Sequence, residues 1–270
     1  MAETAAAPPL PDGVALVRAP NPGPMTLDGT NSWVLRTGGA GGSVVVDPGP
    51  ADAAHLERLA EGGVELVLVT HRHPDHTDAV DRFAELTGAP VRAIDPVWCR
   101  AAEPLADGET ITAGGFRLEI LATPGHTSDS MCVALRRPDE TDAAPLAVLT
   151  GDTVLGRGTT IIAHPDGALG PYLEALDRLL TIGISAAASG DRVAVLPGHG
   201  PALPDLAAIC DAYLAHRAER LDQVRAALAR LGDAATVETV TDTVYVDIDP
   251  AVRGAAEASV RAQLDYLRGA

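Results

Sequence analysis

The feature that most constrains this chain is a group of three imidazoles and a carboxylate at the end of an expected strand. The apolar segment 64–70 leads directly into His71-Arg-His73-Pro-Asp75-His76. Because side chains alternate along a strand, His71 and His73 can point the same way while Asp75 and His76 point elsewhere. Imidazole nitrogen and carboxylate oxygen are zinc ligands, and hydrolytic sites often hold two ions side by side. The pattern favours a metal site, although histidines also cluster by chance.

Three further strand ends carry the same kinds of donor. Two apolar segments each end in Pro-Gly-His and deliver His126 and His199. A third, 146–150, runs into Gly-Asp-Thr and delivers Asp152. A Pro-Gly pair makes a tight turn without a bulky side chain, which lets the following imidazole stand at the edge of a sheet. Four strand ends therefore present potential metal ligands, and such an edge is where a rigid sheet commonly carries catalytic groups.

The motifs HRHPDH, PGHT, TGDT and PGHG, in this order, resemble those of metallo-β-lactamase fold hydrolases. The resemblance implies an α/β fold, the αββα sandwich, with two Zn²⁺ ions per chain. The ligands that it implies are His71, His73 and His126 for one ion, Asp75, His76 and His199 for the other, and Asp152 as a bridge between them. Asp75 is also the expected catalytic residue, because it can orient the attacking water and accept its proton.

Three other segments resemble the β-lactamase-like 2 group within these hydrolases. They are TLDGTNSW at 26–33, LGRGTT at 155–160 and AHRAER at 215–220. Members of that group include endoribonucleases specific for single-stranded RNA, and related sequences include thioesterases that release polyketides from carrier proteins. True β-lactamases of this fold typically have a cysteine where this chain has Asp152, which argues against an antibiotic substrate.

The same resemblance implies a division of the chain. Residues 1–12, rich in alanine and proline, are expected to form a flexible leader, and residues 13–204 the metallo-β-lactamase fold catalytic domain. Residues 205–270 are expected to form a small helical, winged-helix-like domain that helps to wall the active-site cleft. Apolar residues at helical spacing after Pro204 and from Pro250 support the helical prediction for this part.

Helices are also expected after Pro50, His76 and Gly170, where the period of apolar residues changes. Asp47 follows a run of three valines, and two interpretations remain open for it. It either orients a metal-binding histidine through a hydrogen bond or simply forms a turn. His55 is expected to lie on the surface.

Residues for substrate contact are predicted on weaker grounds. Arg157 lies in a glycine-rich segment and either adds positive charge beside the metals or is a solvated turn residue. The remaining candidates are Thr159, Thr160, His164, His216, Arg217 and Arg220. The last three share one helical face and form a basic patch, which either meets an anionic substrate or pairs with Glu219 and Asp222.

Charge and composition limit the function further. The chain has 37 acidic and 20 basic residues and a net charge of −17, which opposes broad attraction to nucleic acid or anionic membranes. No stretch approaches the ~18 apolar residues of a membrane span, and the start has no secretory pattern, so a cytoplasmic location without a membrane partner is expected. Three scattered cysteines without CxxC spacing predict free thiols.

The sequence thus predicts a dinuclear-zinc hydrolase in which a metal-bridging hydroxide attacks the substrate. The expected substrate is anionic or acyl and lies in the cleft between the domains: a phosphodiester of single-stranded RNA, or an acyl thioester on a carrier protein. A small-molecule ester or lactone hydrolase is an alternative. Another is a catalytically silent scaffold that binds a partner, which the complete ligand set disfavours because such a protein would be expected to have lost a ligand. The sequence leaves the oligomeric state open.

Overall fold

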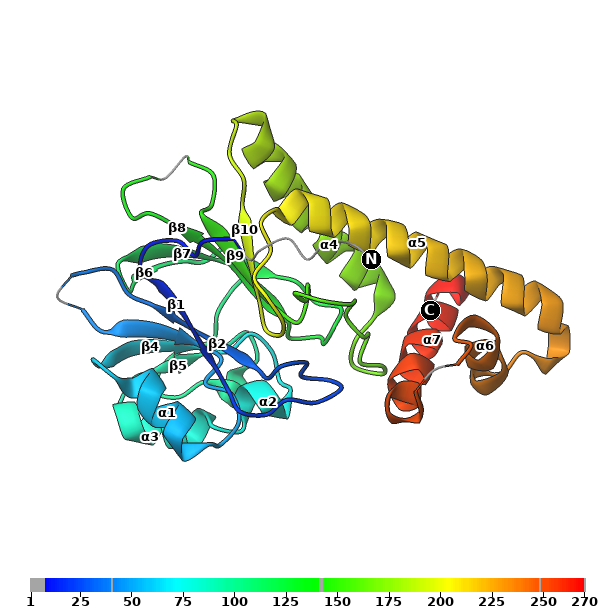
Figure 1. Cartoon of the computed structure of the whole chain (residues 1–270), viewed down its shortest axis with the longest axis horizontal. Helices are drawn as coiled ribbons and strands as arrows, with labels where there is room; N and C mark the ends of the chain where they lie inside the picture. Colours follow the sequence, from blue (N-terminus) through cyan, green and yellow to red (C-terminus); the bar gives the residue numbers. More distant parts are fainter. Residues whose placement is uncertain (1–7, 40, 141–142, 248, 270) are drawn as a thin grey trace.

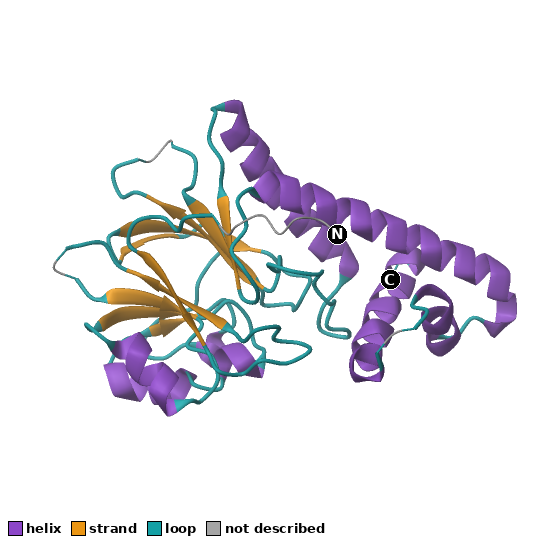
Figure 2. Cartoon of the chain, viewed as in Figure 1, coloured by secondary structure: helices purple, strands orange, loops and turns teal. Residues whose placement is uncertain are grey.

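The structure is a computed structural model, and it describes residues 8–39, 41–140, 143–247 and 249–269. Two five-stranded sheets face each other, and helices cover their outer faces (Figures 1 and 2). The strand order is β1-β2-β3-β4-β5 in the first sheet and β10-β9-β8-β7-β6 in the second. Each sheet mixes parallel and antiparallel pairs. This arrangement confirms the predicted α/β sandwich.

The first sheet is built from the N-terminal strands, which are β1 (Val14–Arg18), β2 (Asn31–Leu35), β3 (Ser43–Val46), β4 (Val64–Leu68) and β5 (Val91–Arg92). The second sheet follows with β6 (Thr110–Ala113), β7 (Phe116–Ala122), β8 (Met131–Arg136), β9 (Ala147–Gly151) and β10 (Ala194–Pro197). The helices are α1 (Ala53–Ala60), α2 (Pro74–Thr77), α3 (Val80–Thr87), α4 (Leu169–Ala188), α5 (Leu206–Leu231), α6 (Val237–Val244) and α7 (Arg253–Arg268).

The core has one layer between the sheets and one under each set of helices. Strand β3 shows how the alternation of side chains produces them. Val44 and Val46 belong to the layer between the sheets, whereas Val45 points the other way and joins Leu56 of α1 and Phe83 of α3. All five side chains are at most 1% exposed. Burying an aliphatic or aromatic side chain of this size stabilises the fold by about 1.5–3 kcal/mol.

Helix α5 takes part in two cores. Its first half packs with α4 on the second sheet, where Tyr213 and Leu221 are buried. Its second half packs with α6 and α7 through Val224, Val240 and Val260. The predicted C-terminal helical region is therefore confirmed, but the winged-helix-like arrangement is not, since no strand forms in the described residues of this region. The division of the chain after residue 204 stays a prediction.

Helix α1 begins shortly after Pro50, as predicted, and both α1 and α5 begin at a capping aspartate. The Asp52 side chain accepts a hydrogen bond from the backbone N–H of His55 at the start of α1, and Asp205 caps α5 in the same way. The prediction that His55 lies on the surface is wrong. Its ring is 2% exposed, and its Nε2 lies 2.9 Å from Ser32 Oγ on strand β2, because α1 packs against the sheet.

Most of the expected leader, residues 1–7, lies outside the described residues. Within the rest of the leader, Leu10 packs against the layer between the sheets. The cysteines Cys99, Cys132 and Cys210 are free thiols, as predicted. In the part of the chain that the structure describes, every helix is too short or too polar to cross a bilayer.

Candidate metal centre

The predicted ligands come from both sheets and meet at one edge of the sandwich. His71 and His73 follow β4 of the first sheet, and the short helix α2 carries Asp75 and His76. The remaining ligands follow strands of the second sheet, with His126 after β7, Asp152 after β9 and His199 after β10. Each motif begins where its strand leaves the sheet, which explains why residues more than one hundred positions apart share one site.

The seven side chains form two adjacent groups. The first group is His71, His73, His126 and Asp152, and the second is Asp75, His76 and His199. Within each group the potential ligand atoms all lie within 4.8 Å of one another. The structure thus brings together every ligand that the sequence suggested, in the partition that the resemblance implied.

Asp152 lies between the two groups. Its Oδ2 is 3.7 Å from His126 Nε2 and 3.4 Å from His199 Nε2, and its Oδ1 is 3.6 Å from His76 Nε2. Oδ1 is buried and has no hydrogen-bond partner within the described residues. Because buried carboxylate oxygens are normally satisfied by a donor, this oxygen fits a metal ligand, and its place between the groups fits a bridging one.

Burial sets the charge of the first group. It lowers the pKa of His71, His73 and His126, in the last case to about 4. These three imidazoles are therefore neutral at pH 7, which is the form that binds a metal ion. Burial also tends to raise the pKa of Asp152, but the neighbouring imidazoles, with His199 foremost, outweigh it and keep this carboxyl group ionised.

The second group has the opposite balance. Burial tends to lower the pKa of His199, but Asp152 and Asp75 outweigh it and raise the pKa to about 9. The pKa of His76 is also raised, because Asp47 and Asp152 outweigh its burial. Asp75 keeps a low pKa despite burial, since both imidazoles hydrogen-bond to it. A metal ion entering this group must therefore displace protons at pH 7.

Asp47 both forms a turn and holds a ligand. Its backbone has a φ of 56°, in the left-handed region, so it turns the chain at the end of β3. Its carboxylate accepts hydrogen bonds from Thr70 N and Thr70 Oγ1, each at 2.8 Å, and lies 2.8 Å from His76 Nδ1. Thr70 Oγ1 is in turn 3.0 Å from His71 Nδ1. Asp47 and Thr70 together orient one imidazole of each group.

Three other contacts hold ligands in place. Ile161 O accepts from His126 Nδ1 at 2.7 Å, Gly29 O lies 3.4 Å from His199 Nδ1, and Thr30 Oγ1 donates to Asp75 Oδ2 at 3.0 Å. Sequence reasoning missed Thr30 and Thr70. Thr70 directly precedes the first histidine, and Thr30 lies in the TLDGTNSW segment, so both had a positional signal. The backbone carbonyls had none, because any residue supplies one.

Two glycines are required by close approach. A Cβ on Gly125 would lie 2.4 Å from Tyr172 Cα, and its φ of 146° also disfavours a side chain. A Cβ on Gly198 would lie 2.5 Å from Asp152 Oδ1 and 2.9 Å from His76 Cε1. The Pro-Gly-His motifs therefore use glycine to let α4 pack behind one histidine and to leave space among the ligands beside the other.

A cavity of about 220 Å³, here the metal pocket, adjoins His126 and Asp152. Arg157, Thr159 and Thr160, three of the residues proposed for substrate contact, line it. It also has an apolar part, formed by Pro24, Met25, Leu27, Leu155 and Ile161. Arg157 is largely exposed and lies 3.4 Å from Asp28, as expected of a solvated residue. It also lines the metal pocket, so its positive charge lies beside the ligands.

The basic residues of α5 lie differently from a solvated helix face. Arg217 is 3% exposed, donates to Thr160 O, and places its guanidinium carbon 5.0 Å from the centre of the Tyr172 ring. The alternative in which this patch pairs with Glu219 and Asp222 does not hold for Arg217 or Arg220, since neither forms an ion pair with a described carboxylate. Helix α5 packs Arg217 against the loop after β9. His164 does not line the metal pocket and instead pairs with Asp265 of α7 at 3.0 Å.

Comparison with known proteins agrees with this geometry. Residues 25–199 match the family described as the metallo-beta-lactamase superfamily. The beta-lactamase-like protein 2 homolog of Caenorhabditis elegans is 28% identical over 272 residues, which cover 96% of this chain and 85% of that protein. The atrochrysone carboxyl ACP thioesterase of Aspergillus fumigatus is 31% identical over 233 residues, which cover 81% of this chain and 65% of the thioesterase.

Solved structures show the same fold. A metallo-beta-lactamase family protein of Thermus thermophilus superposes with a TM-score of 0.74 at 25% identity, covering 95% of this chain and 93% of that one. A beta-lactamase domain protein of Burkholderia ambifaria gives a TM-score of 0.76 at 22% identity, covering 97% and 88%. A further protein, 25% identical with a TM-score of 0.53 over 70% of this chain and 94% of its own, was solved in a di-iron-bound form. The chain therefore belongs to the metallo-β-lactamase superfamily of hydrolases.

Proposed function

We propose that this chain is a dinuclear zinc hydrolase that cleaves phosphodiester bonds of single-stranded RNA. The observation that carries the proposal is the position of Asp152, which lies within 4.0 Å of imidazoles from both groups. Two Zn²⁺ ions held by these seven residues would lower the pKa of a bound water to about 7 and so would supply a nucleophile at neutral pH. The same donors also suit iron, and a protein with this fold was solved in a di-iron-bound form. Iron must therefore be compared with zinc as the metal of this site.

Asp75 is the residue proposed to handle the proton of the attacking water. Its side chain is 26% exposed, so water reaches it, and Thr30 Oγ1 fixes its Oδ2. Its low pKa keeps it ionised, so it accepts a hydrogen bond and orients the water. Arg157 at the rim of the metal pocket is proposed to attract the anionic substrate.

An acyl thioester is the second candidate substrate. The Aspergillus fumigatus relative is named as a thioesterase, and the apolar part of the metal pocket, with Met25, Leu27 and Leu155, suits an acyl chain. The phosphodiester is placed first because cationic side chains continue beyond this pocket along α5. A small-molecule ester or lactone substrate and a silent scaffold are the alternatives to be tested. The proposed location of the protein is the cytoplasm.

The deciding experiment compares substrates on one preparation of zinc-loaded protein. Cleavage of single-stranded RNA is measured beside hydrolysis of an acyl-CoA thioester and a neutral p-nitrophenyl ester, with EDTA and an RNA duplex as controls. We expect EDTA-sensitive cleavage of single-stranded RNA with the highest kcat/KM, and its loss in the Asp75→Asn variant. A higher kcat/KM on the thioester would replace the RNA assignment, and no turnover of any substrate would favour the scaffold. Reconstitution with iron tests the identity of the metal.

A further inference from the structure

A second cavity shares a wall with the metal pocket. It has a volume of about 240 Å³, lies between α5, α7 and the segment 159–161, and is here called the helix cavity. His216, Arg217 and Arg220 of α5 line it, opposite Ser259 of α7. The residues of segment 159–161 line both this cavity and the metal pocket. The metal pocket and the helix cavity therefore lie on two sides of this one segment of chain.

Arg217 adds positive charge to the wall of the helix cavity. The residue is 3% exposed, and its hydrogen bond to Thr160 O uses one guanidinium nitrogen, while Nε is buried without a hydrogen-bond partner in the described chain. A guanidinium buried in this way keeps its charge beside the cavity, and that charge favours an anionic ligand there.

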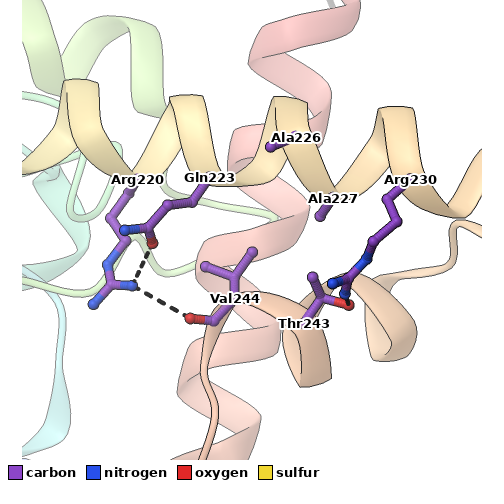
Figure 3. Close-up of a pocket in the computed structure, with 7 residues that line it drawn as sticks. All are labelled: Arg220, Gln223, Ala226, Ala227, Arg230, Thr243 and Val244. Atoms are coloured by element: carbon purple, nitrogen blue, oxygen red, sulfur yellow. Dashed lines mark hydrogen bonds between the residues drawn. The ribbon is translucent and has the colours of Figure 1, made fainter.

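A third cavity lies next to the helix cavity, and Arg220 lines both. It has a volume of about 360 Å³, lies between α5 and α6, and is here called the outer cavity (Figure 3). Arg220 lines it as well as the helix cavity, and Arg230 lines its other end. Arg220 is held by Gln223 Oε1 at 2.7 Å and Val244 O at 3.4 Å, as the dashed lines of Figure 3 show. Cationic positions thus follow one another along α5 away from the metal pocket.

Within the described residues, no carboxylate neutralises these arginines. Among the described residues, none lies within 4.0 Å of the guanidinium groups of Arg217, Arg220 or Arg230, whose hydrogen-bond acceptors are all neutral oxygens. Nearby acidic residues are occupied, since Asp242 of α6 and Glu257 of α7 both pair with Arg253, at 2.8 and 2.9 Å. In a chain of net charge −17, such a row marks a surface for a negatively charged ligand.

We propose that the helix cavity and the outer cavity bind successive phosphates of an RNA strand whose cleaved bond lies at the metal centre. The inference rests on the proposed function, and it adds the path of the strand. The 13 steps from Arg217 to Arg230 span about 20 Å of helix. A thioester on a pantetheine arm carries one phosphodiester, whereas cationic positions repeated over this length match the repeated phosphates of a single strand.

The test measures binding without turnover. A fluorescent phosphorothioate decamer of uridine, which resists cleavage, is titrated with zinc-loaded protein at several salt concentrations. The variant is Arg220→Gln/Arg230→Gln, and its control is Arg82→Gln/Arg192→Gln, which removes the same charge from exposed positions on α3 and before β10. We expect Kd to rise at least tenfold in the first variant and little in the control. The slope of log K against log salt should fall by about 1.4, or 0.7 per lost phosphate contact.

Equal loss in both variants, or no loss in either, would overturn the inference. So would competition by 4′-phosphopantetheine that depends on Arg220 and Arg230 as strongly as RNA binding does, because one phosphate subsite would then account for the cavities. If the double variant unfolds, Arg230→Gln alone, at an exposed position, should lower the slope by about 0.7. If the wild-type protein binds RNA in an arginine-dependent way but does not cleave it, the proposed function is refuted, whereas the binding path for the strand is supported.

Discussion

Replacing Asp47 by asparagine should weaken metal binding in the second group through an imidazole tautomer. The Asp47 carboxylate can only accept, so at 2.8 Å it fixes the proton of His76 on Nδ1 and leaves Nε2 free for a metal ion. Asparagine can keep the hydrogen bond from Thr70 N through its oxygen. Its NH₂ group would then face Nδ1 and act as a donor, which places the imidazole proton on Nε2, where it competes with the metal.

The magnitude follows from the kind of contact that is lost. Changing a hydrogen-bond partner behind a metal ligand typically costs 10- to 100-fold in metal affinity, about 1.4–2.7 kcal/mol. Asp47 also raises the pKa of His76 in the metal-free protein, so the variant loses some proton competition at pH 7. The loss of affinity should therefore be larger at pH 9 than at pH 7, because fewer protons compete for this group at the higher pH.

Competition against a chromophoric zinc chelator measures both sites in one titration. The zinc of the second group should shift 10- to 100-fold in Asp47→Asn, and the other zinc should shift less, because Asp47 reaches the first group only through Thr70. Asp107→Asn is the control, since Asp107 is a surface carboxylate that pairs with Arg178 at 2.7 Å. Equal weakening of both sites, or affinities like those of wild type, would show that the contact between Asp47 and His76 does not hold the ligand as argued.

Three further perturbations separate the roles of the site. Asp152→Ala should reduce bound zinc from about two ions to fewer than one and abolish turnover, and unchanged metal content by elemental analysis would exclude a bridge. Acidification from pH 9 should release the ion of the second group first. Protons bind His199 below its pKa of about 9, whereas His126 stays neutral down to its pKa of about 4. Simultaneous release of both ions on dialysis would contradict this order. Gly125→Ala should displace the loop from Tyr172 and weaken the first group, with Gly190→Ala, where a Cβ meets open space, as the control in the same metal titration.

The sandwich and the seven clustered side chains were predictable because their signals are local. Each ligand directly follows an apolar strand, so strand alternation and a short motif suffice to place it. The ligand-holding contacts were only partly predictable. Thr70 has a signal in its position before His71, but the carbonyl of Ile161 has none, since its role depends on a loop that returns from a distant part of the chain.

The helical region shows why residue spacing alone does not tell which side chains of a helix are buried. Helical periodicity correctly placed α5, yet it could not tell that Arg217 would be buried against Thr160 and Tyr172. Arginine is usually exposed, so composition favoured the wrong environment. The prediction that His55 lies on the surface was wrong for a related reason. Only the packing of α1 on β2 shows that its ring is enclosed beside Ser32.

The origin of the ligands in two separate sheets makes metal occupancy part of the folding equilibrium. His71 and His76 belong to the half of the chain that forms the first sheet, and Asp152 and His199 to the half that forms the second. An ion held by both halves acts as a cross-link, and free zinc at about 1,000 times its Kd would add about 4 kcal/mol to the free energy of unfolding. Zinc supply would then govern how long the polypeptide survives proteolysis as well as whether it reacts.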